Sequence, residues 1–117
     1  MKKLTCIILF FLSIIIVTTV KADHPNQGFI DVPGGPVWYK ISGVGKGLPL
    51  LTLHGGPGST SCNYSLLEPL GDQRPIIRYD QLGSGRSGRP DNLSLWTVDR
   101  FIEALSIIRQ ELHLERL

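Results

Sequence analysis

The chain has 117 residues, enough for one small domain, and its 12 basic and 10 acidic side chains give a formal charge of +2. No basic stripe runs along it, so we expect no nucleic-acid partner. Polybasic segments that would bind an anionic membrane surface are also absent from the sequence.

The first 22 residues are typical of a secretory signal peptide. A pair of lysines precedes an uncharged, largely apolar run over residues 4–20, and Val20 and Ala22 are the small side chains expected before a cleavage point. Cleavage there would leave 9 basic and 10 acidic side chains in residues 23–117. The alternative is an uncleaved N-terminal membrane anchor, and in either case we expect residues 23–117 to be exported.

The first elements predicted after the signal peptide form a β-hairpin. Two short apolar runs, over 29–32 and 37–41, flank a turn of two prolines and two glycines at 33–36. Within the second run, Trp38 and Lys40 alternate with apolar residues, which predicts a strand with one solvated face.

Two further strands and a short helix are predicted downstream. Residues 48–53 are apolar on both faces, as expected of a strand that helices cover on either side. Residues 64–70 predict a short helix, and residues 75–80 predict the next strand, which leads into a glycine-rich turn.

The last segment has helical periodicity. Thr97 is the expected N-cap, and Asp99 in the first turn suits the helix dipole. The order strand, helix, strand, helix predicts an α/β fold with a parallel sheet. We expect Asp99, Arg100, Glu103, Arg109 and Gln110 to lie off the buried face, which consists of Val98, Phe101, Ile102, Leu105, Ile108 and Leu112.

The most informative motif, His-Gly-Gly-Pro-Gly at residues 54–58, directly follows the apolar strand 48–53. Glycines leave no Cβ where the backbone turns sharply, so such a loop can present main-chain N–H groups to a developing oxyanion. The alternative is a plain turn that ends the strand. We favour the oxyanion interpretation, because a plain turn rarely needs this run of glycines.

A second motif, Tyr-Asp-Gln-Leu-Gly-Ser-Gly-Arg-Ser, occupies residues 79–87. Its glycines match the spacing of a dinucleotide-binding loop, but the next helix is predicted to begin only near Thr97, too late to receive a pyrophosphate. We therefore expect no NAD or FAD, and no other cofactor and no metal. Asp80 could be a catalytic carboxylate, but we expect it to cap the turn.

Together these segments resemble a known family. HGGPG after an apolar strand, YDQLGSGRS roughly two dozen residues later, and SLWTVDRF at the start of the last helix resemble the proline iminopeptidase group of the α/β-hydrolases, with its prolinamide and amino-acid-amide hydrolases. The likeness covers residues 28–117. It implies an α/β-hydrolase fold, in which an antiparallel hairpin is followed by parallel strands and helices. It also implies a serine hydrolase that releases an N-terminal residue, often proline, from a small peptide, or ammonia from an amino-acid amide.

The resemblance also implies roles for individual residues. Gly56 would donate its backbone N–H to the oxyanion, and Gly55 and Gly56 would contact the substrate. His54 would fix the loop rather than act as the general base. The structural residues of the two motifs would be Pro57, Gly58, Asp80, Gln81, Gly83 and Gly85.

The G-x-S-x-G elbow that carries the nucleophile in this fold does not occur in the sequence. Ser87 has Gly85 two residues before it, but Arg89 two residues after it. We therefore expect residues 23–117 to be an incomplete domain that ends before the elbow and contains neither nucleophile, acid nor base.

We expect such a piece to be inactive alone, and either to self-associate through the apolar strand 48–53, left exposed at the sheet edge, or to unfold in part. The alternatives are another α/β-hydrolase, such as an esterase or epoxide hydrolase, and a non-catalytic exported remnant.

Overall fold

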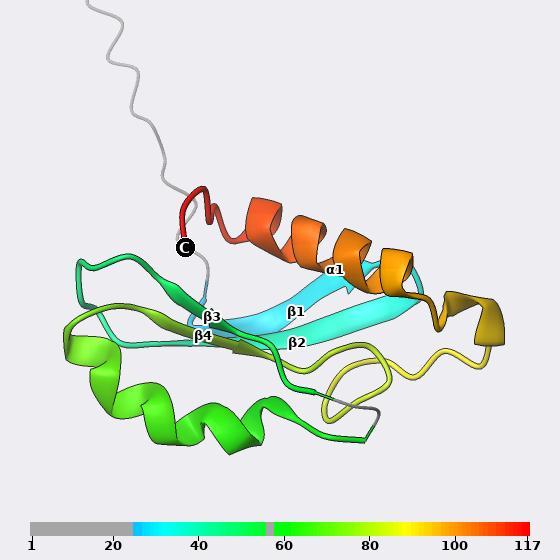
Figure 1. Ribbon diagram of the computed structural model, residues 1–117, viewed down its shortest axis with the longest axis horizontal. Helices are drawn as coiled ribbons and strands as arrows, with labels where there is room; N and C mark the ends of the chain where they lie inside the picture. Colours follow the sequence, from blue (N-terminus) through cyan, green and yellow to red (C-terminus); the bar gives the residue numbers. More distant parts are fainter. Residues whose placement is uncertain (1–24, 56–57) are drawn as a thin grey trace, which may run out of the picture.

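The computed structural model describes residues 25–55 and 58–117, so the predicted signal peptide lies outside the described residues. A four-stranded mixed sheet forms the centre, in the order β1-β2-β4-β3 (Figure 1). β1 (Gln27–Val32) and β2 (Gly35–Ser42) form the predicted antiparallel hairpin. β4 (Ile76–Tyr79) pairs antiparallel with β2, and β3 (Leu50–Thr52) pairs parallel with β4.

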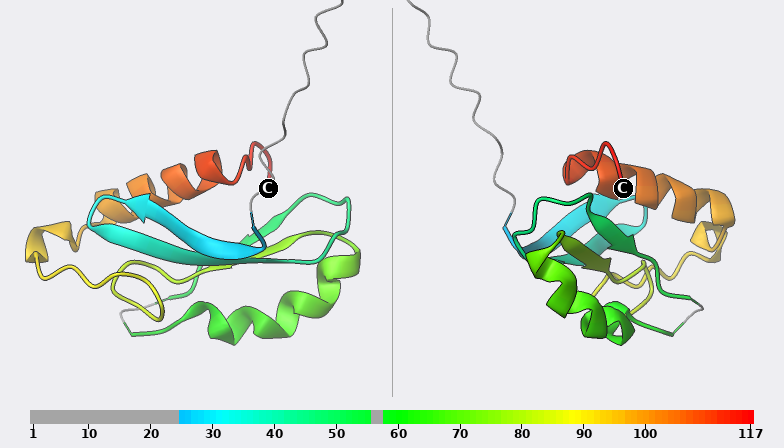
Figure 2. Two further views of the ribbon diagram at one scale, coloured as in Figure 1. Left: turned by 180° about the vertical axis from the view of Figure 1, so that it is seen from behind. Right: turned by 60° about the vertical axis from the view of Figure 1, so that its left-hand side comes forward.

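Helices lie on both faces of the sheet, α1 on one and η1 on the other (Figures 1 and 2). η1 (Ser61–Asp72) is a 3-10 helix that is longer than the predicted 64–70 helix. A one-turn 3-10 helix, η2 (Leu93–Leu95), precedes α1 (Val98–Glu111). Within the described ranges, no helix combines the length and apolar character needed to cross a membrane.

The prediction that β2 has one solvated face is wrong, because both of its faces are covered. Trp38 is buried, and the guanidinium carbon of Arg86 lies 4.2 Å from the centre of its ring. Lys40 lies toward η1, where its Nζ is 3.1 Å from a carboxylate oxygen of Glu68. A loop and a helix that are distant in sequence therefore cover the residues whose alternation indicated solvent.

The N-terminus of α1 forms as predicted, but its buried face is rotated from the predicted one. The Thr97 hydroxyl accepts a hydrogen bond from the backbone N–H of Arg100 at 3.3 Å, which caps the helix. Val98 and Ile102 are 73% and 57% exposed, while Arg100 is buried. The small side chain of Ala104 lies on the buried side instead, which allows close approach to the sheet.

Arg100 is accommodated because the apolar ring of Phe101 and a backbone carbonyl both contact its guanidinium. Its guanidinium carbon lies 3.9 Å from the centre of the Phe101 ring, and its Nε donates to the Leu95 carbonyl at 2.8 Å.

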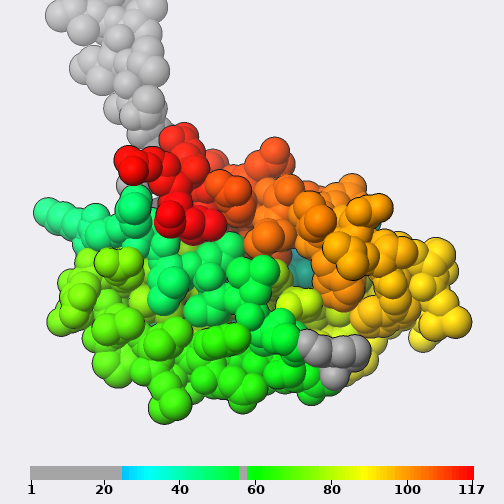
Figure 3. Space-filling view, viewed as in Figure 1, coloured from blue at the N-terminus to red at the C-terminus, as the bar shows by residue number. Residues whose placement is uncertain are grey.

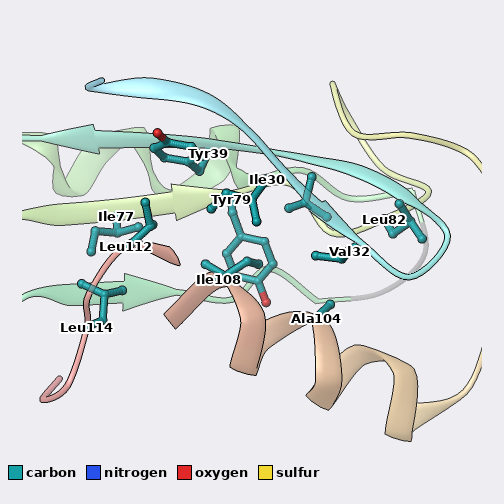
Figure 4. Packing of buried hydrophobic residues seen from close by; sticks show 11 residues of the cluster. Ile30, Val32, Tyr39, Ile77, Tyr79, Leu82, Ala104, Ile108, Leu112 and Leu114 are labelled. Atoms are coloured by element: carbon teal, nitrogen blue, oxygen red, sulfur yellow. The ribbon is translucent and has the colours of Figure 1, made fainter. Parts of the chain in front are cut away.

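The main hydrophobic core lies between α1 and the sheet (Figure 4). Tyr79 points from β4 toward α1, where Ile108 also lies in the cluster. The buried members of the cluster are Ile30, Val32, Val37, Tyr39, Ile77, Tyr79, Leu82, Ala104, Ile108, Leu112 and Leu114. β3 pairs parallel with β4, so the carboxyl ends of these two strands lie at the same end of the sheet.

Candidate active site

The two sequence motifs meet at the carboxyl ends of the parallel strands β3 and β4. In open α/β sheets, ligands bind in the crevice outside these strand ends. His54 and Gly55 follow β3, while Asp80 and Gln81 follow β4. Gly56 and Pro57 lie outside the described residues, so their predicted roles stay predictions.

His54 and Gln81 join the two strand ends through two hydrogen bonds, both donated by Gln81 and accepted by His54. The backbone N–H of Gln81 donates to His54 Nε2 at 2.9 Å, and the Gln81 side-chain amide donates to the His54 carbonyl at 2.5 Å. His54 is only 3% exposed. The start of the glycine-rich loop is therefore held to the end of β4 by both backbone and side-chain groups.

This arrangement determines the tautomer of His54. A ring nitrogen that accepts an N–H bond carries no proton, so the neutral imidazole has its proton on Nδ1. That nitrogen lies 3.4 Å from the Gly55 carbonyl. With Nε2 engaged by a backbone amide, His54 is placed to fix the loop.

Asp80 joins the same region to the N-terminus of η1. Its Oδ1 accepts from the backbone N–H and the hydroxyl of Ser61, at 2.8 and 2.7 Å, and its Oδ2 accepts from the Arg86 N–H at 3.0 Å. Arg78 Nη1 donates to the Ser61 carbonyl at 3.0 Å, which holds Ser61 from a second side. Both ends of the loop between His54 and Ser61 are thus attached to β4 and the segment that follows it.

The hydrogen bonds around Asp80 favour its ionised form. Burial raises the pKa of this carboxyl, but the bonds from Arg86 and Ser61, together with the positive charge of Arg86, outweigh burial and hold the pKa below its usual value. The Asp80 carboxylate is buried, and both of its oxygens accept hydrogen bonds from protein groups, so Asp80 stabilises the turn and the start of η1.

The glycines of the two motifs have different surroundings. A Cβ at Gly83 would lie 2.1 Å from the Trp96 ring, and one at Gly85 would lie 2.2 Å from Asp80 Oδ2. Among the described residues, a Cβ at Gly55 or Gly58 would meet nothing within 4 Å. Packing therefore explains the absence of side chains in the second motif, whereas the first motif borders open space.

In residues 25–55 and 58–117, no three side chains of His, Cys, Asp or Glu come together as metal ligands would. A hollow at the end of α1 lies away from both motifs and is lined by Ser106, Arg109, Gln110, His113, Leu114 and Glu115.

Residues 49–117 match the family model described as the alpha/beta hydrolase fold. The chain belongs to the α/β-hydrolases. It is 50% identical over 91 residues to a proline iminopeptidase of Heyndrickxia coagulans, an alignment that covers 77% of this chain and 32% of that relative. This hydrolase chain therefore spans about a third of the length of such relatives.

Solved structures give the same fold assignment. A proline iminopeptidase of Mycobacterium smegmatis superposes with a TM-score of 0.69 at 28% identity, over 77% of this chain and 33% of that one. A proline iminopeptidase-related protein of Thermus thermophilus superposes with a TM-score of 0.66 at 32% identity, over 78% and 33%. The chain is thus similar in fold to about a third of each of these two structures.

Two residues of this hydrolase site are missing from the sequence-based predictions. Ser61 binds Asp80 from 19 positions away, and Ser87 Oγ donates to the Asp80 carbonyl while accepting from the Trp38 N–H at 2.8 Å. Ser87 lies inside the second motif, so its position was a usable signal. Ser61 is the first residue of η1 and follows other small polar residues, and no pattern in the sequence marks it.

Proposed function

We propose that this chain supplies the oxyanion-binding part of an exported serine hydrolase of proline-iminopeptidase type. Such an enzyme would release N-terminal prolyl residues from small peptides, or hydrolyse amino-acid amides. The 50% identity to the Heyndrickxia coagulans proline iminopeptidase supports this substrate class over an esterase or epoxide hydrolase.

The observation that carries the proposal is a glycine-rich loop that is fixed at both ends and borders open space. Gln81 holds His54 at one end, and Asp80 holds Ser61 at the other. Between them, no atom of the part of the chain that the structure describes lies within 4 Å of where a Cβ of Gly55 or Gly58 would be. We propose that the backbone N–H of Gly56 donates to the oxyanion there, because donors fixed before the reaction stabilise developing charge without reorganisation.

We also propose that residues 1–117 alone do not hydrolyse these substrates. The hydroxyls of Ser61 and Ser87 both donate to Asp80, and His54 Nε2 accepts from Gln81. These groups hold the scaffold together and are not arranged as nucleophile and base. Oxyanion donors without a nucleophile cannot form an acyl-enzyme.

The test uses the chain itself and a chimera in which residues 25–117 replace the matching segment of the Heyndrickxia coagulans enzyme. We expect no release of arylamine from a proline arylamide by the chain, and turnover by the chimera. Gly56→Pro should lower kcat of the chimera by roughly a hundredfold, since one oxyanion donor is lost.

The control in the same loop is Ser59→Ala, which keeps every backbone N–H and should change kcat less than about twofold. An unchanged kcat in the Gly56→Pro chimera would overturn the oxyanion role. Turnover by the chain alone that a serine-directed phosphonate abolishes would overturn its inactivity. A folded chimera that cleaves only esters would favour the esterase alternative.

Export is a separate part of the proposal. We propose that residues 1–22 direct secretion and are removed, so that the mature protein begins at Asp23. N-terminal sequencing of the exported product tests this. Recovery of a chain that still begins at Met1 in the membrane fraction would instead support an anchor.

A further inference from the structure

Arg78 is a charged side chain at a position where burial favours an apolar one. It lies on the face of β4 that η1 covers, and η1 forms the lower surface of the molecule in the view of Figure 3. Ile76, two positions earlier on the same face, is fully buried, and Arg78 is itself only 5% exposed. Replacing a buried ion pair by apolar side chains often leaves stability unchanged or raises it. Packing and stability therefore do not explain an arginine at this position.

The register of the sheet makes this arginine more unfavourable still. Arg78 lies directly opposite Lys40 of β2 in the antiparallel pair, and like charges in that arrangement repel each other. Glu68 of η1 balances them, because its Oε1 lies 3.1 Å from Lys40 Nζ and 2.5 Å from Arg78 Nη2. The Nε of Arg78 has no partner among the described residues, so the two terminal nitrogens alone orient the guanidinium.

The other terminal nitrogen of Arg78 reaches the end of the glycine-rich loop. Arg78 Nη1 donates to the Ser61 carbonyl at 3.0 Å, while Asp80, two positions further along the chain, accepts from the Ser61 N–H at 2.8 Å. Two side chains therefore hold both backbone polar groups of one residue. The planar guanidinium presents separate nitrogens to Glu68 and to Ser61, whereas a lysine would offer a single ammonium.

We propose that Arg78 is a positioning residue for the reaction, because it holds Ser61 and with it residues 58–61 at the end of the glycine-rich loop. Glu68 holds Arg78 in turn, so the position of η1 on the sheet determines the position of the loop end. This role rests on the proposed oxyanion function of the loop. Displacement by about 1 Å can lower a rate about a hundredfold even when the change lies away from the reacting atoms.

The main test is Arg78→Met in the chimera with the Heyndrickxia coagulans enzyme, with kcat measured per site that a serine-directed phosphonate labels. We expect kcat for a proline arylamide to fall at least about tenfold and KM to change less than about twofold, because a displaced loop affects the oxyanion more than the bound substrate. A variant that merely folded less well would show fewer labelled sites and an unchanged kcat per site. Lys40→Met is the matched control: Lys40 contacts the same carboxylate but not Ser61, so kcat should stay within about twofold.

Arg78→Lys keeps the test decisive if Arg78→Met fails to fold. Its ammonium retains the charge beside Glu68 but lacks the second nitrogen for Ser61, so a loss of kcat in the same direction is expected. Hydrogen exchange in the full 117-residue chain needs no substrate: the Ser61 amide should exchange at least about tenfold faster in either Arg78 variant and at an unchanged rate in Lys40→Met. An unchanged kcat in an Arg78 variant that folds would overturn the positioning role, as would an unchanged exchange rate at Ser61.

These measurements separate a failure of the positioning role from a failure of the oxyanion function. If Gly56→Pro lowers kcat and the folded Arg78 variant does not, the oxyanion function stands and the positioning role is wrong. If Gly56→Pro leaves kcat unchanged, the oxyanion function is wrong and the positioning role falls with it. The exchange rate of the Ser61 amide then still reports whether Arg78 holds the end of the loop.

Discussion

The carboxyl end of β3 and the outer edge of β3 are a few residues apart and are built in opposite ways. At the carboxyl end, His54 is held by two hydrogen bonds to Gln81, and the nearby Asp80 carboxylate accepts three. At the edge, the backbone N–H groups of Leu51 and Leu53 have no partner among the described residues, and the Leu53 side chain is 49% exposed. Short polar side chains from two neighbouring turns can thus complete the loop scaffold locally, whereas a strand edge needs another strand.

A large loss of stability is expected from removing the buried charge of Asp80. Asp80→Asn places an amide N–H₂ against groups that donate, and should lower the free energy of unfolding by about 3 kcal/mol. The control Asp31→Asn, on the exposed side of β1, should stay within about 0.5 kcal/mol. Urea unfolding measures both, and equal effects would mean that Asp80 does not stabilise the turn and the start of η1.

Two glycines with nearly the same backbone conformation sharpen the comparison. Gly83 and Gly58 have φ of 89° and 87°, so alanine at either position costs about 1–2 kcal/mol of backbone strain. At Gly83 alone, the added methyl group would also overlap the Trp96 ring, which should cost about 1–3 kcal/mol more. Thermal or urea unfolding should therefore separate the two alanine variants. Equal destabilisation would show that the ring of Trp96 moves away freely.

Acid should lower the stability of the fold by protonating carboxylates that accept hydrogen bonds. The pKa of Asp80 is lowered in the folded protein, so its contribution to stability is present above the ordinary carboxyl pKa of about 4 and is lost as the pH falls through the lowered value. The pKa of Glu68 is also lowered, by hydrogen bonds from Lys40 and then Arg78, with the same sign.

Stability measured from pH 6 to pH 2 should thus be level at first and then decline below about pH 4. Glu68→Gln removes the contribution of one of the two carboxylates, so part of the loss of stability below about pH 4 should remain, caused by Asp80. A variant with no remaining decline would assign the whole effect to Glu68.

The smallest effect on stability is expected from substitutions on the exposed side of α1, which carries Val98 and Ile102. Ile102 is 57% exposed, so Ile102→Ala should change the free energy of unfolding by less than about 0.5 kcal/mol. Ile108 is fully buried in the core, and Ile108→Ala should cost about 2–5 kcal/mol. Similar losses at both positions would mean that this side of α1 is covered in solution.

Local patterns were sufficient to predict the order of the elements. The hairpin, the strand at 75–80 and the Thr97 cap depend on turn residues, alternation and a capping hydroxyl within a few positions. The rotation of α1 was not predictable in this way. Val98 is exposed and Arg100 buried because Phe101 and Leu95 accommodate the guanidinium, which helical spacing alone does not encode.

The candidate site, too, could be predicted from the sequence only in part. The two glycine motifs could be located from the sequence, because several unusual residues occur together in each. The pairing of Asp80 with Ser61 could not be predicted, since a single serine at the start of a helix carries no periodic signal and its partner is 19 positions away. The oxyanion role of Gly56 remains a prediction.

The central claim is that the two motifs form one preassembled unit through His54 and Gln81, and ¹⁵N NMR of the imidazole tests it most directly. The structure predicts a neutral ring with its proton on Nδ1, an unprotonated Nε2, and a coupling across the hydrogen bond between Nε2 and the Gln81 amide. A proton on Nε2, or a Gln81 amide without that coupling in the folded chain, would contradict the account.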